Sequence, residues 1–338
     1  MGLDSLLIPA VLFFLLGVIA QLVNSDLKFP EGMSKGMSLY LLMAIGLKGG
    51  AELANSDLFV AMNAIFWAIV LGFVIPIIGY ALLRFRNKID PMNAAAITAH
   101  YGSVSAGTFL TAIAFLEASG VTHESYPIIM MVMMESPAII IGLVLAAMAR
   151  KRLAADKIGA DGTAAMGQAE APKTDWGPLL KDAFTNGSVL LLLGALIIGA
   201  IVPPEAMKTL YPFTKEIFMG VLCLFLLEMG MVAAKRLDSF KKVGGTLIAF
   251  GIIMPLIGGF IGVFVGHSML GFSVGGTLLV AILSASASYI AVPPVMRFGV
   301  PEANPSYYLA LSLGITFPFN VVVGIPLFYQ VSQWYVGG

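Results

Sequence analysis

Two stretches of small and hydroxyl-bearing residues interrupt apolar segments at matching places in the two halves of the chain. The first runs from His100 to Thr108 with the sequence HYGSVSAGT, and the second from Ser284 to Tyr289 with the sequence SASASY, followed by Pro293 and Pro294. Such a stretch can unwind a helix, which frees backbone N–H and C=O groups and lets a ligand approach them. Paired breaks in corresponding helices of a duplicated membrane protein indicate a transporter's binding site.

The chemistry that these stretches offer is the binding of a small anion. The N-terminal ends of half-helices carry partial positive charge and unpaired N–H groups, and Ser103, Ser105 and Thr108 add hydroxyls. A seam of small residues for close helix packing is the alternative interpretation of the first stretch. Its recurrence at Ser284–Ser288 favours binding.

Two carboxylates lie within apolar segments, where a charge is costly and marks a functional hypothesis. Glu135 comes shortly before Pro137, so we expect it to bind a coupling ion or handle a proton. We expect Glu228 to pair with Lys48, which lies in the corresponding helix of the other half.

Two polar residues of the last apolar segment, Thr316 and Asn320, can join helices by hydrogen bonds. Asn320 is close to Pro318, which makes it a further site candidate.

Several kinds of chemistry have no matching pattern in the sequence. No His, Cys and carboxylate spacing fits a metal enzyme, and no catalytic triad order, phosphate loop or dinucleotide fingerprint is present. We therefore expect neither an enzyme nor a resident cofactor. A net charge of zero argues against a nucleic-acid partner.

The composition is that of an all-α integral membrane protein. Of the 338 residues, 59% are hydrophobic and only 11% are charged, and the mean hydropathy is +0.93, whereas a soluble domain has about 25% charged residues. A span needs about 20 mostly apolar residues. The sequence predicts ten such segments, at 5–23, 36–54, 58–83, 92–117, 126–149, 186–202, 215–234, 243–266, 274–296 and 305–332.

The distribution of Lys and Arg predicts the orientation in the membrane. Most of them lie in alternate loops, including 150–157 and 235–242, whereas Lys208 and Lys215 lie on the other side. By the positive-inside rule the first set is cytoplasmic, so both termini are expected outside, in the periplasm of a bacterial inner membrane.

The two halves resemble each other in sequence. The pattern from Gly72 to Gly79 recurs from Gly251 to Gly258, and Pro137 corresponds to Pro318. Five helices in each half force the second half to insert upside down, which gives an inverted repeat with broken helices 4 and 9. The expected domains are a first repeat at 1–149, a cytoplasmic linker at 150–180 and a second repeat at 181–338. The linker is a flexible connector or, alternatively, a docking site for a regulator.

Over nearly its whole length the chain resembles the sodium-dependent bicarbonate transporter family of cyanobacteria. The motifs that carry this resemblance are Tyr101-Gly-Ser-Val-Ser-Ala-Gly-Thr108, Glu135-Ser-Pro-Ala138, Pro293-Pro-Val-Met-Arg-Phe-Gly-Val-Pro-Glu-Ala-Asn-Pro-Ser-Tyr307 and Gly324-Ile-Pro-Leu-Phe328.

The resemblance implies a homotrimer whose subunits have a core and a gate domain, with bicarbonate between the broken helices and sodium beside it. It also implies docking of a trimeric PII-like protein on the cytoplasmic side. Carried over to this sequence, the anion site comprises Gly102, Ser103, Val104, Ser105, Ser286, Ala287 and Ser288.

This chain departs from the family pattern where ligands are expected. Tyr289 stands where the family has an Asp after the serines, Glu135 replaces an Asp, and Thr316-Phe317-Pro318 replaces a smaller Gly-Thr-Pro. A phenol is neutral at pH 7 and cannot supply a carboxylate's charge to sodium. The candidate ion-coupling residues lie at and next to these positions. They are Glu135, Ser288, Tyr289, Thr316 and Asn320.

The sequence thus predicts a secondary transporter of a small anion, with sodium-coupled bicarbonate uptake as the first hypothesis. The same scaffold moving another carboxylate-like anion, coupled to protons or without sodium, is the alternative. A membrane sensor or assembly protein that transports nothing is the alternative from another class.

Overall fold

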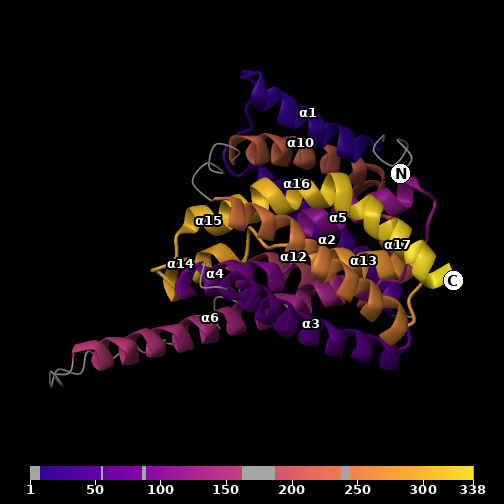
Figure 1. Ribbon diagram of the computed structural model, residues 1–338. Coiled ribbons are helices and arrows are strands. Elements are labelled where there is room, and N and C mark those ends of the chain that lie inside the picture. Colours follow the sequence, from indigo (N-terminus) through magenta and orange to yellow (C-terminus); the bar gives the residue numbers. More distant parts are fainter. Residues whose placement is uncertain (1–7, 55, 86–88, 162–186, 237–243, 338) are drawn as a thin grey trace.

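The computed structural model describes residues 8–54, 56–85, 89–161, 187–236 and 244–337, and these residues form helices and no strand (Figure 1). In chain order the helices are α1 (Pro9–Leu22), α2 (Met33–Leu53), α3 (Leu58–Arg84), α4 (Pro91–Gly102), α5 (Ala106–Ala118), α6 (Tyr126–Asp161), α8 (Gly187–Ile201), α9 (Pro204–Lys208), η3 (Pro212–Glu216), α10 (Phe218–Arg236), α12 (Gly245–Phe264), η5 (Val265–Met269), α13 (Val274–Ala285), α14 (Val292–Gly299), α15 (Pro305–Leu309), η6 (Ala310–Thr316), α16 (Phe317–Phe319), η7 (Asn320–Gly324) and α17 (Ile325–Gly337).

Five helices of the described part are long and apolar enough to cross a membrane, and three shorter ones are also apolar. The long ones are Leu58–Arg84, Tyr126–Leu153, Pro212–Arg236, Gly245–Met269 and Pro305–Gly337. The short ones are α1, α8 and α13. The chain is therefore a multi-pass membrane protein, and the total of ten spans stays a prediction.

The segments expected at 92–117 and 274–296 are each divided by a stretch that is not helical. The first becomes α4 and α5, and the second becomes α13 and α14. By contrast, the last apolar segment is one helical span, Pro305–Gly337, with π-helical turns at η6 and η7. π-Helical turns of this kind often mark functional sites.

The helix that ends the first half continues beyond the segment predicted for it. α6 reaches Asp161, and Figure 1 shows its far end leaving the body of the molecule. The rest of the expected linker, residues 162–180, lies outside the described residues, as does the start of the expected second repeat.

Two pairs of helices pack closely through glycines. α1 lies along α10, where Gly17 faces the Leu227 carbonyl and Gly230 faces the Phe14 carbonyl. α2 lies along α8, where Gly50 faces the Leu196 carbonyl and Gly199 faces the Leu47 carbonyl. The hydrogen side chain of glycine lets the two backbones approach, as is common between membrane helices.

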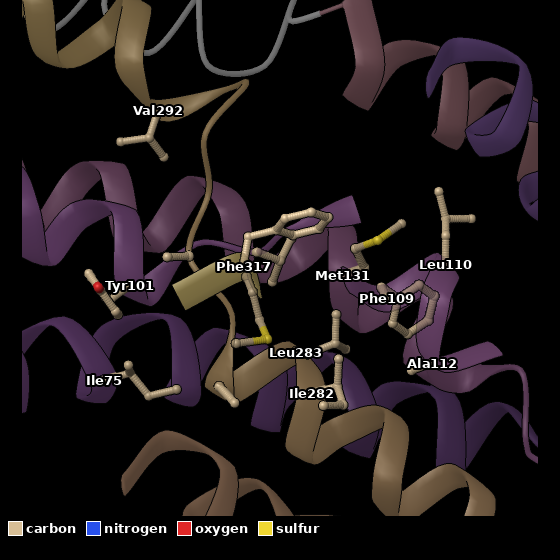
Figure 2. Packing of buried hydrophobic residues seen from close by; sticks show 14 of the residues in the cluster. Ile75, Tyr101, Phe109, Leu110, Ala112, Met131, Ile282, Leu283, Val292 and Phe317 are labelled. Atoms are coloured by element: carbon tan, nitrogen blue, oxygen red, sulfur yellow. The ribbon is translucent and has the colours of Figure 1, made fainter. Parts of the chain in front are cut away.

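The remaining helices enclose one apolar core around the two interrupted segments. α4 packs on α3 and α6, and α13 packs on α12, α5 and α17. Figure 2 shows Ile282 and Leu283 of α13 near Phe109 of α5, with Met131 of α6 and Phe317 in the same cluster. Both interrupted segments are therefore buried between longer helices.

An ion pair ties the far part of α6 to the loop after α14. The Arg150 guanidinium donates to both Glu302 carboxylate oxygens, at 2.7 Å each, and to the Gly299 carbonyl at 2.9 Å. The hydrogen bond from Arg150 lowers the pKa of the Glu302 carboxyl. This contact fixes the loop between α14 and α15 on α6.

The expected pair between Glu228 and Lys48 is wrong. Lys48 Nζ lies 2.8 Å from Glu117 Oε1 at the end of α5, and Glu228 accepts a hydrogen bond from Ser34 Oγ at 2.9 Å. Both partners are set by how α2 packs on α5 and α10, which a comparison of the two halves does not reveal.

Candidate functional site

The first break is a short extended segment between α4 and α5. α4 ends at Gly102, where a Cβ would collide with the ring of Pro76 in α3. Ser103 has φ −86° and ψ 179°, and Ser105 then caps α5. Its Oγ accepts hydrogen bonds from Thr108 N–H at 3.2 Å and from the Thr108 hydroxyl at 2.9 Å. A serine N-cap of this kind stabilises a helix start.

The second break follows α13 in the same manner. Ser286 leaves the helix with φ −89° and ψ 168°, and its hydroxyl donates to the Leu283 carbonyl at 3.0 Å. The carbonyl of Ala285, the last residue of α13, accepts a hydrogen bond from Asn320 Nδ2 at 2.8 Å. The chain resumes helical structure at Val292.

Two hydrogen bonds join the two breaks directly. Ser105 N–H donates to Ser286 Oγ at 2.9 Å, and Ser288 N–H donates to the His100 carbonyl at 2.7 Å. Two segments about 180 residues apart in the chain therefore form one structural unit.

A small cavity lies beside this unit, between the breaks and the helices α2, α6 and α8. It has a volume of about 40 Å³. Its polar lining comes from both breaks and from the facing helices. The lining residues are Ser38, Leu42, Val104, Ser105, Ala106, Met131, Val132, Glu135, Ser188, Val189, Leu192, Ser288, Tyr289, Ile290 and Ala291.

The start of α5 offers hydrogen-bond donors beside this cavity. The N–H groups of Ala106 and Gly107 have no carbonyl within the helix, and Ala106 lines the cavity. Across the cavity, Ser38 Oγ is buried without a hydrogen-bond partner among the described residues. Buried polar groups normally have partners, so the Ser38 hydroxyl is available to a polar group in the cavity.

Glu135 brings a carboxylate to the same cavity. No ion pair or hydrogen bond to its side chain is present in the described part of the chain. Of the described residues that line the cavity, it is the one with an ionisable carboxyl group.

The candidate residues divide into those that line the cavity and those that lie behind it. Val104, Ser105, Ser288, Glu135 and Tyr289 line it. Those outside the lining are Gly102, Ser103, Thr108, Ser286, Ala287, Thr316 and Asn320.

The residues behind the cavity hold the breaks in place. Thr316 Oγ1 lies 2.7 Å from the Tyr101 hydroxyl and donates to the Gly251 carbonyl at 2.8 Å. Asn320 binds the end of α13, as described above. Through these contacts, Thr316 and Asn320 support the helices that end at the breaks, and they do not line the cavity.

Tyr289 fills the position at which the family resemblance implies an Asp. Its ring packs edge-on against Phe317, with centroids 5.6 Å apart. Its hydroxyl lies against Gly107, where a Cβ would be 2.5 Å away. The phenol therefore fits because residue 107 has no side chain.

Sequence reasoning missed Ser38 and Ser188, which line the cavity from α2 and α8. Each is a hydroxyl near one end of an apolar segment, and neither stands in a motif. They can be recognised as cavity residues only when the packing of α2 and α8 against the breaks is known.

One comparison with known proteins identifies the family of the chain. No curated protein matches the chain. The family model described as the Na⁺-dependent bicarbonate transporter superfamily matches residues 9–333. With nearly its whole length covered, the chain belongs to the Na⁺-dependent bicarbonate transporter superfamily.

Proposed function

We propose that this protein is a secondary transporter that takes up bicarbonate together with sodium. The observation that carries the proposal is the joined pair of breaks, which presents serine hydroxyls and the start of α5 to a cavity containing a carboxylate. Donors of this kind suit a small oxyanion.

The size of the cavity supports a very small substrate. A volume of about 40 Å³ accommodates roughly three water-sized groups. A cavity of this size favours an anion of a few non-hydrogen atoms, because a larger carboxylate requires the cavity to widen further.

The carboxylate of Glu135 supports coupling to a cation. An anion and an ionised carboxylate in one cavity repel each other, and burial strengthens the repulsion. A sodium ion between them, or a proton on Glu135, removes this cost. Anion and cation therefore enter together.

The presence of Tyr289 favours a second candidate, in which protons rather than sodium accompany the anion. A sodium ion at the second break has a neutral phenol beside it instead of a carboxylate. In this alternative, Glu135 carries the proton, and the substrate is bicarbonate or another small carboxylate-like anion.

The proposed architecture is two inverted five-helix repeats that form core and gate domains. The glycine contacts support it, because α1 meets α10 and α2 meets α8, which exchanges the first two helices of each half. We also propose a homotrimer in the bacterial inner membrane with both termini outside. A PII-like regulator would bind from the cytoplasm, next to the linker.

Uptake into proteoliposomes tests the function. We expect labelled bicarbonate to accumulate when a sodium gradient is imposed and to equilibrate slowly without one. Under the proton-coupled alternative, a pH gradient drives uptake and sodium has no effect. Uptake of another anion but not of bicarbonate contradicts the proposed substrate, and no uptake of any anion contradicts transport.

A further inference from the structure

A second cavity, of about 270 Å³, lies along the same helices as the central one. We call it the vestibule. Ala44, Ile45, Lys48 and Glu52 of α2 line it, as do Ile113 and Glu117 of α5 and Ile128 of α6. The remaining lining residues are His123, Thr214, Lys215 and Phe218.

The two cavities lie at different heights along α2. Ser38 in the central cavity is one turn inside the start of α2, whereas Lys48 in the vestibule is about 15 Å further along the helix. α5 shows the same offset, since Ala106 lines the central cavity and Glu117 lines the vestibule about 16 Å away. The vestibule therefore lies toward the outer ends expected for these helices.

Between Ser38 and Lys48, the α2 residues that line the two cavities are apolar: Leu42 lines the central cavity, and Ala44 and Ile45 line the vestibule. With Ile113 of α5 and Ile128 of α6, which also line the vestibule, Leu42 and Ile45 form a layer of apolar side chains that are all at most 3% exposed. Above this layer, the 2.8 Å ion pair between Lys48 and Glu117 joins α2 to α5. Contact between these two helices thus closes the direct route from the vestibule to the breaks.

We propose that the Lys48–Glu117 ion pair is a latch that holds the outer route closed. To reach the breaks from the vestibule, an anion needs α5 to move relative to α2, by sliding or by tilting, and either motion separates the two charges. Their side chains are 33% and 41% exposed, so the pair is weak enough to open. The purpose of the latch rests on the proposed transport function, but its effect on access does not.

Chemical labelling of a single cysteine measures this access. Cys223 is the one cysteine of the sequence, so Cys223→Ser gives a cysteine-free chain. Ala106→Cys then places a thiol at the start of α5, facing the central cavity. A membrane-impermeant thiol reagent added outside intact cells reports how often this position opens outward.

We expect Lys48→Gln and Glu117→Gln each to raise the outside labelling rate of Ala106→Cys roughly two- to fivefold, the range that a partly exposed ion pair supplies. The exchanged pair, Lys48→Glu with Glu117→Lys, should return the rate toward that of the parent. This restoration also shows that the exchanged variant is folded.

Two controls make the measurement specific. Glu52→Cys, an exposed vestibule position, should react at the same rate in every background. Lys208→Gln breaks a more exposed ion pair of the same length, 2.8 Å to Glu205 in α9, and should leave the rate at Ala106→Cys unchanged.

Unchanged labelling of Ala106→Cys in both single variants, while Glu52→Cys still reacts, overturns the latch. An equal increase with Lys208→Gln also overturns it. Raised labelling in a chain that transports no anion keeps the latch and removes only the proposed transport function.

Discussion

At the scale of single residues, the site contains two kinds of buried serine. The Ser286 hydroxyl accepts a hydrogen bond from Ser105 N–H and donates one to the Leu283 carbonyl, so its donor and one of its acceptor positions are used within the protein. Ser38 is nearly as buried, 3% against 1% exposed, but has no partner among the described residues. The first serine joins the two breaks, whereas the hydroxyl of the second lines the cavity with its hydrogen-bonding capacity unused among the described residues.

This difference predicts opposite outcomes for two similar substitutions. Ser286→Ala should lower the free energy of unfolding by about 1–3 kcal/mol, because it leaves the buried Ser105 N–H unpaired. Ser38→Ala should leave stability unchanged and weaken anion uptake. Thermal unfolding in detergent and uptake in proteoliposomes check both. Equal stability of the two variants contradicts the assignment.

Under the proposed function, Glu135 is the residue expected to carry the coupling ion, because it is the carboxylate among the described residues that line the cavity. Glu135→Gln keeps the shape but removes the charge, so uptake should no longer respond to an imposed sodium or proton gradient. Uptake measured against both gradients separates the two cases. Glu205→Gln, at an exposed surface position, is the control. Unchanged ion dependence in Glu135→Gln excludes this role.

At the scale of helices, glycine contacts set how closely neighbouring elements pack. Gly230 of α10 faces the Phe14 carbonyl of α1, so a methyl group at this position forces the two backbones apart. Gly220 lies on the same helix with nothing within 4 Å of the corresponding position. One helix therefore offers a tight and an open glycine.

Gly230→Ala should destabilise the protein by about 1–3 kcal/mol through overpacking. Gly220→Ala should be neutral or stabilise it by up to about 1 kcal/mol, because alanine favours the helix. Thermal unfolding of both variants in the same detergent checks this. A loss of stability with Gly220→Ala as large as that with Gly230→Ala would contradict the packing account.

Much of the helix layout was predictable, because apolar runs and polar interruptions are local signals. The two breaks followed from Gly and Ser within apolar segments. The extension of α6 to Asp161 did not, since the prediction used hydropathy, although Ala, Leu, Lys and Arg in this stretch are good helix formers. The π-helical turns η6 and η7 were not predictable either, because no local sequence pattern indicated them.

At the scale of the whole molecule, the apolar exterior suits a bilayer. Large apolar side chains of α3, including Leu58, Phe59 and Phe66, are more than half exposed, and they face hydrocarbon in a membrane instead of water. The polar groups gather inside, at the breaks and the vestibule.

The site was predictable only in part, because it forms where distant helices meet. Glu135 and the serines of the breaks were identifiable from their own positions in the sequence. Ser38, Ser188 and the Lys48–Glu117 pair depend on how α2 and α8 pack against the breaks. The mistaken pairing of Lys48 with Glu228 has the same cause.

The cross-bonding of the two breaks has a consequence for biosynthesis. When the first half of the chain leaves the ribosome, the His100 carbonyl and the Ser105 N–H still lack the partners that Ser288 and Ser286 will provide. In hydrocarbon, each unpaired group costs several kcal/mol. The newly inserted first half must therefore keep this region hydrated or shielded until about 180 more residues are made, so the unit formed by the two breaks is among the last parts of the protein to mature.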